Sequence, residues 1–473
     1  MLNFDFIPRL EKHPGIAVGG ATFSGAELAK AAARIADALL AAGIREGHRI
    51  VLLFGNTAEF AASLLAVFGI KASAVLANPA FTARELQQAL LRTQAAAILA
   101  PTQERQRFAN FGCDEVTSIE SLQRQVALFR TGLQSSAAAA ERTVQFTSGG
   151  TGESKIVPRT SAHLADELDS FASRVNYGPD DTIVCPVPLF HTYGLINGLL
   201  LPLFTGARIA LLERFLPADV ADTVRQFRAT VLIGVPAMYR GLSQSFSAAR
   251  SDFASLRICF SAGSELLPSQ FEEFRSRFGL RINQQYGSTE TGAIAINLLD
   301  EGADPLAVGV PLPRREIRLG TSADAEEIAV RSPGSAVGYL HEPELTARHF
   351  LSGWYLTGDV GFLSEDGVLT IKGRRTAFIN VGGYKVDPSE IENVLRGSAA
   401  VADCAVLGIP DDSNGGQYAR AYVVARAVVT PSDLVAYCKQ RLAAYKVPRQ
   451  VCLVSSLPRT ASGKILAKDL LHL

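Results

Sequence analysis

Short apolar segments alternate with amphipathic segments along the first three quarters of the chain. Apolar residues recur at helical spacing from Gly25 to Ile44, and Arg49–Phe54 then has the composition of a buried parallel strand. Thr82 and Glu85 form a capping box before another helical segment. We expect further helices at Ala58–Phe68 and Leu86–Arg92 and further strands at Ala74–Leu76, Ala96–Leu99, from Ile183, and at Arg208–Leu212, Thr230–Gly234 and Leu256–Ser261. This alternation predicts a layered α/β fold.

The pattern changes after Ala293, where glycine and proline become frequent and short strands such as Glu327–Arg331 and Val368–Lys372 replace long helices. This composition indicates a β-rich subdomain. Beyond Gly373 a shorter pattern of strands and helices begins. We therefore expect a large N-terminal domain over residues 1–372, a hinge at 373–377 and a small α+β C-terminal domain over 378–473.

Composition and charge narrow the function. The 473 residues are 48% apolar, enough for a large core and too many for one ordinary domain. Lys+Arg and Asp+Glu both number 46, so charge gives no argument for nucleic acid as a partner. Six scattered cysteines and the absence of an HExxH sequence predict neither disulfides nor zinc.

No segment reads as a membrane span or a signal peptide. The most apolar stretch, Leu195–Leu212, is interrupted by Pro202, Gly206 and Arg208, and the N-terminus meets charged residues before any apolar run. We expect a cytoplasmic protein that acts on a small molecule.

The segment Thr147–Lys155 is a candidate phosphate-binding loop. Glycines let the backbone approach an anion, hydroxyl and amide groups donate to phosphate oxygens, and Lys155 supplies positive charge. The segment is not a Walker A loop, because Ile156 stands where that motif needs Ser or Thr. Taken alone, a solvated Gly/Ser-rich turn explains it equally well.

Four further segments follow in a fixed order, and each offers groups that a nucleotide needs. Gln285–Glu290 combines hydroxyls with a carboxylate suited to a phosphate and its Mg²⁺. Gly353–Asp359 offers a carboxylate for two ribose hydroxyls, Gly373–Arg374 follows at the expected hinge, and Pro458–Lys464 comes near the end of the chain. Each could be an ordinary loop, but all five in this order are improbable by chance.

With these segments the chain resembles the adenylate-forming superfamily of acyl-CoA synthetases, adenylation domains and luciferases. The likeness covers nearly the whole chain, and Gly382–Glu392 resembles the acyl- and aryl-CoA ligase version. The resemblance implies an ATP- and Mg²⁺-dependent ligase in which a carboxylate attacks the α-phosphorus to give acyl-AMP and pyrophosphate. A thiol then displaces AMP. It also implies that the small domain rotates between these two half-reactions.

The resemblance also implies a role for each matching residue. Residues expected to hold the β- and γ-phosphates are Thr147, Ser148, Gly149, Gly150, Thr151, Gly152 and Lys155. Those expected around the adenine are Gly263, Ser264, Glu265, Gln285, Tyr286 and Gly287. Thr289 is expected at the α-phosphate, Glu290 at the Mg²⁺, Asp359 at the ribose, Arg374 near ribose and phosphate, and Lys464 at the carboxylate and α-phosphate oxygens. Gly382, Gly383, Tyr384 and Lys385 are expected along the thiol channel.

The acid is expected beside His191, which the resemblance places near its carboxylate, although a lone histidine is more often a buried structural residue. The other expected pocket residues are Tyr193, Val235, Met238, Ser261, Ala262 and Gly287. They are mostly apolar and include no cation or carboxylate to pair with an amino acid. We therefore favour a hydrophobic fatty or aromatic monocarboxylate as substrate.

Two alternatives to a CoA ligase stay open at this stage. CoA and an acyl carrier protein both present phosphopantetheine, so a stand-alone enzyme that loads a carrier protein would have the same residues. A non-catalytic nucleotide-binding homologue is the other, because Gly150 and Thr376 depart from the family pattern. Retention of the expected catalytic and binding side chains argues against it, namely Glu290, Asp359, Arg374 and Lys464.

Overall fold

The computed structural model divides into two compact units, and each is described by itself. The first consists of Met1–Thr147, Ser154–Ile317 and Val330–Tyr355, and the second contains Arg318–Ala329 and Leu356–Leu473. Within these bounds the structure describes residues 6–109, 111, 113–135, 140–147, 155–298, 304–319, 327–374, 379–381, 384–386, 388–410, 417–442, 444–460 and 465–472. The expected hinge at 373–377 lies partly outside them, and the domain boundary there stays a prediction.

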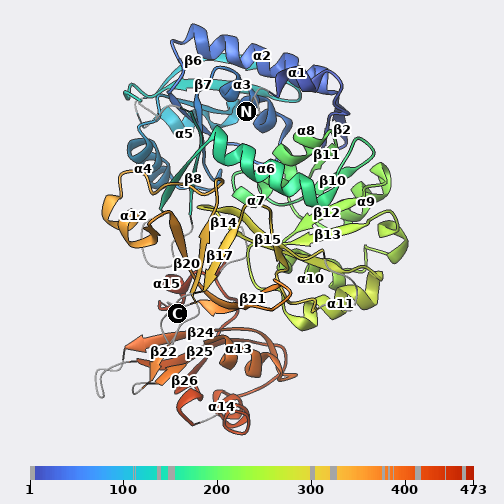
Figure 1. Ribbon diagram of the computed structural model, residues 1–473, viewed down its shortest axis with the longest axis vertical. Coiled ribbons are helices and arrows are strands. Elements are labelled where there is room, and N and C mark those ends of the chain that lie inside the picture. The colour runs from blue at the N-terminus through green and yellow to red at the C-terminus, as the bar shows by residue number, and fades with distance from the viewer. Residues whose placement is uncertain are drawn as a thin grey trace. The chain divides into compact units, whose positions relative to one another are not determined.

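The first unit contains a sheet whose described strands follow the order β6-β7-β5-β3-β4-β8-β9. Figure 1 labels β6, β7 and β8 of this sheet. Its strands are β3 (Arg49–Leu52), β4 (Ser73–Leu76), β5 (Ala97–Pro101), β6 (Asp114–Glu120), β7 (Gln125–Arg130), β8 (Glu141–Phe146) and β9 (Ile156–Thr160). The central strands β5, β3, β4 and β8 are parallel, and β7, β6 and β9 are antiparallel to their neighbours. Strand β8 therefore ends beside β9 at the expected phosphate loop.

A second sheet in the same unit follows the order β16-β15-β14-β13-β12-β10-β11-β1-β2 among the described strands. Its strands are β1 (Ile16–Val18), β2 (Ala21–Phe23), β10 (Thr182–Cys185), β11 (Arg208–Leu211), β12 (Val231–Gly234), β13 (Ile258–Ser261), β14 (Ile282–Ser288), β15 (Gly292–Ile296) and β16 (Val310–Pro311). The run from β1 through β11, β10, β12 and β13 to β14 is parallel. Most expected adenine and acid residues lie in strands of this run or directly follow them along the chain.

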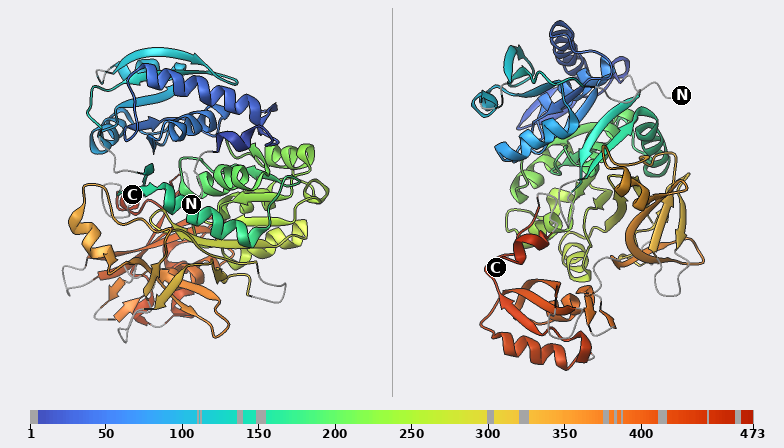
Figure 2. Two further views of the ribbon diagram at one scale, coloured as in Figure 1. Left: turned by 45° about the horizontal axis from the view of Figure 1, so that its top comes forward. Right: turned by 90° about the vertical axis from the view of Figure 1, so that its left-hand side faces the viewer.

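Helices connect the strands of the first unit (Figure 2). They are α1 (Ile7–Leu10), α2 (Gly25–Ala41), α3 (Ala58–Gly69), α4 (Ala83–Thr93), α5 (Arg105–Ala109), α6 (Ser161–Val175), α7 (Thr192–Leu195), α8 (Leu201–Thr205), α9 (Pro217–Phe227), α10 (Pro236–Gln244), α11 (Pro268–Phe278) and α12 (Pro343–His349). Short 3₁₀ turns lie at Thr102–Glu104 and Arg250–Phe253, and Ile196–Leu200 is a π-helical turn.

Helix α3 is buried on all sides, from Ala58 to Phe68. Its apolar residues join one large core that also contains Ile50 and Leu52 of β3 and Ile183 of β10. A helix that is mostly apolar on every face is stable where it is removed from water. The buried Glu59 of α3 accepts hydrogen bonds from the Gln123 and Arg124 amides. The core around α3 therefore joins residues of both sheets.

Short strands follow the second sheet along the chain. They are β17 (Glu316–Leu319), β18 (Glu327–Arg331), β19 (Phe350–Leu351), β20 (Trp354–Leu363) and β21 (Leu369–Arg374). Their order is β17-β18-β20-β19, with β21 also pairing β20. The division between the two units falls within β17, β18 and β20.

The rest of the second unit has its own apolar core, built from strands and two helices. Its elements are β22 (Ile379–Val381), β23 (Tyr384–Val386), α13 (Pro388–Arg396), β24 (Val401–Pro410), β25 (Gln417–Ala425), α14 (Pro431–Lys439), a 3₁₀ turn at Ala444–Lys446, β26 (Gln450–Leu453) and α15 (Ala467–Leu470). Strands β24 and β25 are antiparallel, and β26 pairs parallel with β25.

The structure confirms the expected α/β fold with a β-rich segment and a smaller α+β part. Helix and strand positions agree with the sequence-based expectations to within a few residues, and Thr82 and Glu85 form the predicted capping box. Several described elements were not predicted individually, among them strands β1, β2, β6, β7, β9 and β19 and helices α1, α5, α6 and α12. All six cysteines are free. Among the described residues, no helix is long and apolar enough to cross a membrane.

Asn56, between β3 and α3, joins the first sheet to the second. Its Nδ2 donates to the carbonyls of Val187 (2.9 Å) and Leu212 (3.1 Å), and its Oδ1 accepts from the Leu189 amide (2.8 Å). The side chain is 3% exposed. These backbone groups follow β10 and β11, so one amide satisfies buried donors and acceptors where the strands of two sheets end.

We predict that Asn56→Ala lowers the free energy of unfolding by about 3 kcal/mol, because it leaves buried backbone groups without partners. Urea unfolding followed by circular dichroism measures the change. Asn78→Ala is the control, since Asn78 accepts one local hydrogen bond from the Ala80 amide and should cost under about 1 kcal/mol. Equal losses in the two variants would contradict the bridging role of Asn56.

Helix α6 begins with a capping box in which a histidine takes the usual place of Glu or Gln. His163 Nδ1 accepts from the Thr160 amide (3.2 Å), and Thr160 Oγ1 accepts from the His163 amide (3.3 Å). Burial and, to a smaller extent, the positive charge of the nearby Arg159 lower the pKa of His163 to about 4, although Asp166 opposes the shift. The neutral ring is needed because protonated Nδ1 cannot accept a hydrogen bond.

The lowered pKa predicts a loss of stability in acid. Between about pH 6.5 and pH 4 the unfolded chain binds a proton at His163 and the folded chain does not. The free energy of unfolding therefore falls as the pH falls through this window. We predict that His163→Gln, whose amide oxygen can still accept, loses less stability than the original chain between pH 7 and pH 5. Urea midpoints at several pH values test this. Parallel losses would show that His163 protonation is not linked to unfolding.

Candidate active site

The two ends of the expected phosphate loop are held together at the end of β8. Phe146 pairs with Ile156, and the Thr147 amide donates to the Lys155 carbonyl (2.9 Å). Ser148, Gly149, Gly150, Thr151 and Gly152 lie outside the described residues, so their expected phosphate contacts stay predictions. Thr147 and Lys155, the first and last residues of the expected loop, therefore lie next to each other.

Lys155 and Glu290 meet at one tyrosine. Lys155 Nζ donates to the Tyr339 hydroxyl (3.4 Å) and lies 3.4 Å from His349 Nε2. The Tyr339 hydroxyl in turn donates to Glu290 Oε1 (2.9 Å), and Lys155 Nζ lies 4.9 Å from the centre of the Tyr339 ring. A cation and a carboxylate from distant parts of the chain are thus joined through a single phenol, an arrangement suited to a phosphate and its metal.

Glu290 is a buried carboxylate, 5% exposed, in the turn between β14 and β15. Burial raises the pKa of Tyr339 and of Tyr355, and the negative charge of Glu290 raises both further. Both phenols therefore keep their protons at neutral pH and act as donors toward the carboxylate. The Glu290 backbone is also held, since its carbonyl accepts from the Ala336 amide (2.7 Å).

The donor set around Glu290 fits Mg²⁺. Magnesium prefers hard oxygen ligands and usually binds through one or two carboxylates together with substrate phosphates. Glu290 supplies one carboxylate, and Thr289 places a half-buried hydroxyl residue beside it. No group of three or more His, Cys, Asp or Glu side chains that could hold a metal is found among the described residues. This chemistry suits a metal that arrives with phosphates rather than a permanently caged ion.

The turn that carries Thr289 is closed by its own side chains. Ser288 Oγ lies 3.0 Å from Thr291 Oγ1 and accepts from the Thr291 amide (3.2 Å). Gly287 must be glycine, because a Cβ there would lie 3.0 Å from the Ala293 Cα and closer still to the Gly292 carbonyl. The close pairing of β14 and β15 therefore fixes where Thr289 and Glu290 leave the sheet.

Gln145, near the end of β8, connects the phosphate-loop strand with the His191 segment. Its Nε2 donates to the Phe190 carbonyl (3.3 Å), and its Oε1 accepts from Thr192 Oγ1 (3.0 Å). The ring centres of His191 and Phe190 lie 4.5 Å apart. His191 is therefore held between two residues that Gln145 binds.

The remaining expected acid residues lie on elements of the second sheet. Val235 caps α10, and Ser261 and Ala262 lie at the end of β13; all three are buried. The Tyr193 hydroxyl is satisfied by the Phe260 carbonyl (3.0 Å). Met238 packs on the apolar core. The group is mostly apolar, and the buried Ser261 hydroxyl has no hydrogen-bond partner among the described residues.

The expected adenine residues follow β13 and lie within β14. Gly263, Ser264 and Glu265 are exposed, and Gly263 has a φ of +91°, which favours glycine. Gln285 and Tyr286 are buried in β14 next to the exposed Gly287. The expected adenine residues thus lie at the carboxyl ends of the neighbouring parallel strands β13 and β14. Ligands bind at this end of the strands in α/β sheets.

In the second unit, two expected ribose residues occupy facing positions. Asp359 of β20 pairs with Arg374 of β21 in antiparallel register. Tyr384 and Lys385 pair with Val381 and Asn380 in the β22–β23 hairpin. Gly382, Gly383 and Lys464 lie outside the described residues, and their roles stay predictions.

Sequence reasoning did not find Tyr339, Tyr355 or Gln145. Tyr355 lies within the Gly353–Asp359 segment, but only Asp359 was selected there as a ligand. Tyr339 lies between Gly338 and Leu340, and its hydrogen bond to Glu290 spans 49 residues of sequence. No local pattern marks such a contact.

Comparisons with known proteins give one consistent result. A model of the AMP-binding enzyme family matches residues 9–340, and a model of the AMP-binding enzyme C-terminal domain matches residues 390–464. The chain is 30% identical over 452 residues to an oxalate–CoA ligase of Arabidopsis thaliana, covering 90% of this chain and 88% of that protein. It is also 30% identical over 470 residues to a feruloyl-CoA synthase of an Amycolatopsis species, covering 95% and 93%.

A solved structure is similar over the same length. It is the o-succinylbenzoate CoA synthetase from Bacillus subtilis in complex with ATP and magnesium ion, with a TM-score of 0.84, 27% sequence identity and 99% of each chain covered. The likeness therefore extends through both units.

Proposed function

The chain belongs to the AMP-binding enzyme family, and from this premise we propose that it is an ATP-dependent ligase that joins a hydrophobic carboxylic acid to CoA. The observation that carries the proposal is the constellation of Lys155, Tyr339 and Glu290 beside the end of β8. This constellation brings together a cation, a hydrogen-bond donor and a buried carboxylate. Nucleotidyl transfer needs groups of this kind, because it depends on positioning and charge neutralisation.

The proposed reaction has two steps. The acid's carboxylate oxygen attacks the α-phosphorus of ATP, the bond to the bridging oxygen breaks, and pyrophosphate leaves with its electron pair. The sulfur of CoA then attacks the acyl carbon, AMP leaves, and the thiol proton is released. Lys464 and Thr289 stabilise the charge at the α-phosphate in the first step. Gly382, Gly383, Tyr384 and Lys385 serve the thiol in the second.

We assign the nucleotide contacts by the same family positions. Thr147, Lys155 and the intervening residues hold the β- and γ-phosphates, and Glu290 holds Mg²⁺, which neutralises phosphate charge when it is bound. Asp359 accepts hydrogen bonds from the ribose hydroxyls, and Arg374 lies near ribose and phosphate. The facing register of Asp359 and Arg374 supports this assignment, since both reach the same edge of one hairpin.

The acid is expected to be a hydrophobic monocarboxylate, with His191 beside its carboxylate. Val235 and Ala262 are buried, and the Tyr193 hydroxyl already has a partner. Burying an unpaired ammonium or a second carboxylate against such residues is costly. The relatives do not decide this point, because at equal identity one is a ligase of oxalate and another a synthase of feruloyl-CoA.

CoA is the proposed acceptor, since the relatives above are CoA ligases and synthases. Loading of a carrier protein is the less favoured alternative, and retention of the constellation around Glu290 argues against a non-catalytic homologue. Cytoplasmic location stays a prediction from the sequence.

A panel of acids tests the proposal. We predict pyrophosphate release with a medium-chain fatty acid or an aryl acid, with kcat/KM at least about 10²-fold above that for a free α-amino acid or oxalate. Mass spectrometry of the products with CoA and, separately, with phosphopantetheinylated carrier protein identifies the acceptor. Preference for oxalate or an amino acid would overturn the pocket assignment, and transfer only to the carrier protein would favour the alternative.

A second prediction separates the half-reactions. Lys464→Ala should reduce acyl-AMP formation by about 10²-fold or more, because it removes a cation from a developing negative charge. The same variant should still convert supplied acyl-AMP to acyl-CoA. Lys468→Ala is the matched control, since Lys468 is an exposed lysine of α15, and it should leave both rates unchanged. Equal loss of both half-reactions in Lys464→Ala would contradict the adenylation role.

A further inference from the structure

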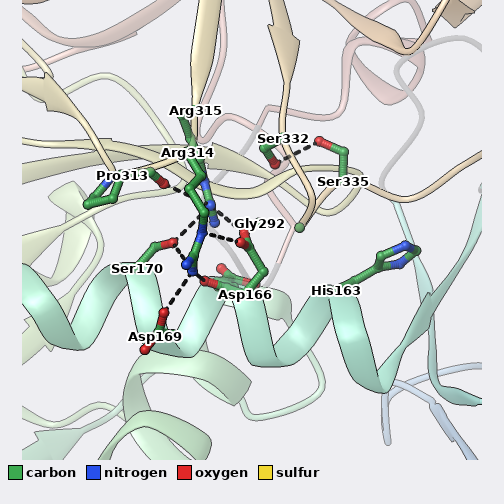
Figure 3. A network of polar contacts seen from close by, with 12 residues as sticks. His163, Asp166, Asp169, Ser170, Gly292, Pro313, Arg314, Arg315, Ser332 and Ser335 are labelled. Atoms are coloured by element: carbon green, nitrogen blue, oxygen red, sulfur yellow. Dashed lines mark hydrogen bonds and ion pairs between the residues drawn. The ribbon is translucent and has the colours of Figure 1, made fainter. Parts of the chain in front are cut away.

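Two buried ion pairs surround helix α6 in the first unit. Arg159 Nη1 donates to Glu167 Oε2 (2.6 Å), and the two side chains are 0% and 1% exposed. Arg315 pairs with Asp166, and these side chains are 0% and 7% exposed. Figure 3 shows Arg315 and its neighbour Arg314 reaching Asp166, with Arg314 also bonded to Asp169 at the solvent side. We call Arg159, Asp166, Glu167 and Arg315 the α6 charge network.

The α6 charge network binds the backbone just after Glu290. Glu167 Oε1 accepts from the Ala293 amide (2.7 Å), and Arg315 Nε donates to the Ala293 carbonyl (3.2 Å). Both backbone groups of Ala293 are thus held by charged side chains. Ala293 also pairs with Gly287 across β14 and β15. The network therefore fixes the second end of the turn that carries Glu290.

The same network holds the second backbone segment that contacts Glu290. Arg159 Nη2 donates to the Gly334 carbonyl (2.9 Å), two residues before Ala336, whose amide donates to the Glu290 carbonyl (2.7 Å). Tyr339, the donor to the Glu290 carboxylate, follows in the same segment. Arg159 and Glu167 thus connect the two segments between which Glu290 is held.

Two glycines allow the charges to come so close. Gly292 has a φ of +67°, and a Cβ there would collide with the Glu167 carboxyl group. A Cβ at Gly334 would lie 2.8 Å from Asp166 Oδ2. The carboxylates of α6 therefore occupy the space that side chains would fill at these two backbone positions.

Stability alone does not account for four buried charges. Desolvation of a buried ion pair consumes most of its Coulomb energy, and apolar residues of similar volume often give equal or greater stability. Apolar side chains, however, make no hydrogen bonds to a backbone amide or carbonyl. The feature specific to the charged residues is their fixed hold on Ala293 and Gly334.

We propose that Arg159 and Glu167 are positioning residues for the Glu290 carboxylate, and that they act through the backbone of Ala293 and Gly334. The proposal rests on the proposed role of Glu290 at the metal. Removal of a group that orients a metal ligand through hydrogen bonds, without touching the metal, typically weakens metal binding by about 10- to 100-fold.

The test compares two double variants in which a buried pair becomes apolar. Arg159→Met/Glu167→Leu removes the Glu167 hydrogen bond to the Ala293 amide and the Arg159 hydrogen bond to the Gly334 carbonyl. It leaves the Arg315 hydrogen bond to the Ala293 carbonyl in place, and neither residue of the pair remains as an unpaired buried charge. Arg49→Met/Glu141→Leu is the matched control, since this pair is also buried at 3% and 3% exposure in the same unit and touches neither segment. Mn²⁺ binding in the presence of an α,β-methylene ATP analogue, followed by electron paramagnetic resonance, measures the metal site without turnover.

We expect at least about tenfold weaker Mn²⁺ binding in Arg159→Met/Glu167→Leu and no change in the control pair. Hydrogen exchange of residues 288–296 and 332–340 should be faster only in the first variant. Unchanged Mn²⁺ affinity in that variant, while Glu290→Gln weakens binding, overturns the positioning role and leaves the proposed function intact. If Glu290→Gln has no effect either, the metal role of Glu290 is rejected and the inference falls with it.

Arg159→Lys keeps the proposal testable if the double variant does not fold. Lysine retains the charge opposite Glu167 but has no second fixed N–H for the Gly334 carbonyl. We expect faster exchange in residues 332–340 alone, because Glu167 still holds Ala293, together with a several-fold loss of Mn²⁺ affinity. Hydrogen exchange that becomes faster equally in both segments, or in neither, would contradict the proposal that Arg159 holds Gly334 independently of the Glu167 hydrogen bond to Ala293.

Discussion

The burial of the Glu290 carboxylate constrains much of the first unit. A carboxylate removed from water must receive hydrogen bonds or lie near positive charge, because its desolvation is otherwise too costly. The Tyr339 hydroxyl supplies a hydrogen bond and Lys155 approaches the same hydroxyl. The segment containing Tyr339 and the strand β9 that follows Lys155 must therefore come together at the turn after β14. Several features of the fold serve this meeting, including the tight β14–β15 pairing and the tethers from α6.

The arrangement also explains why one buried carboxylate is compatible with a reversible ligand site. Tyr339 and Tyr355 have raised pKa values because of burial and of Glu290, so they remain neutral donors. Neutral donors satisfy the carboxylate without cancelling its charge, which stays available to a metal. A lysine or arginine in direct contact would form an ion pair that the metal would have to break. The separation of Lys155 from Glu290 by a phenol fits this requirement.

The fold could be predicted well from the sequence because helices and strands leave patterns among residues that are close together along the chain. Apolar periodicity placed α2 and α3, and a capping box placed α4, since these patterns reflect contacts within a few residues. Strand β6 was missed because it is mostly exposed and has a polar sequence, whereas β7 was missed although its residues from Val126 to Phe129 are apolar and buried. The candidate site was predictable only where its residues form motifs. Tyr339 and Arg315 contact partners 49 and 149 residues away, and no spacing rule encodes such pairs.

The two parts of the candidate site differ in how strongly the structure fixes them. On the phosphate side, Glu290, Ala293 and Ala336 are held by hydrogen bonds from several elements, so a substitution there disturbs many partners. On the proposed acid side, Val235 and Ala262 present buried apolar side chains, and such positions tolerate volume-conserving apolar exchanges best. This difference between the two sides agrees with the relatives, of which two that are each 30% identical to this chain are named for different acids, oxalate and the feruloyl group. Under the proposed function, the buried charge network holds the residues of the shared chemistry, and the choice of acid depends on the apolar residues.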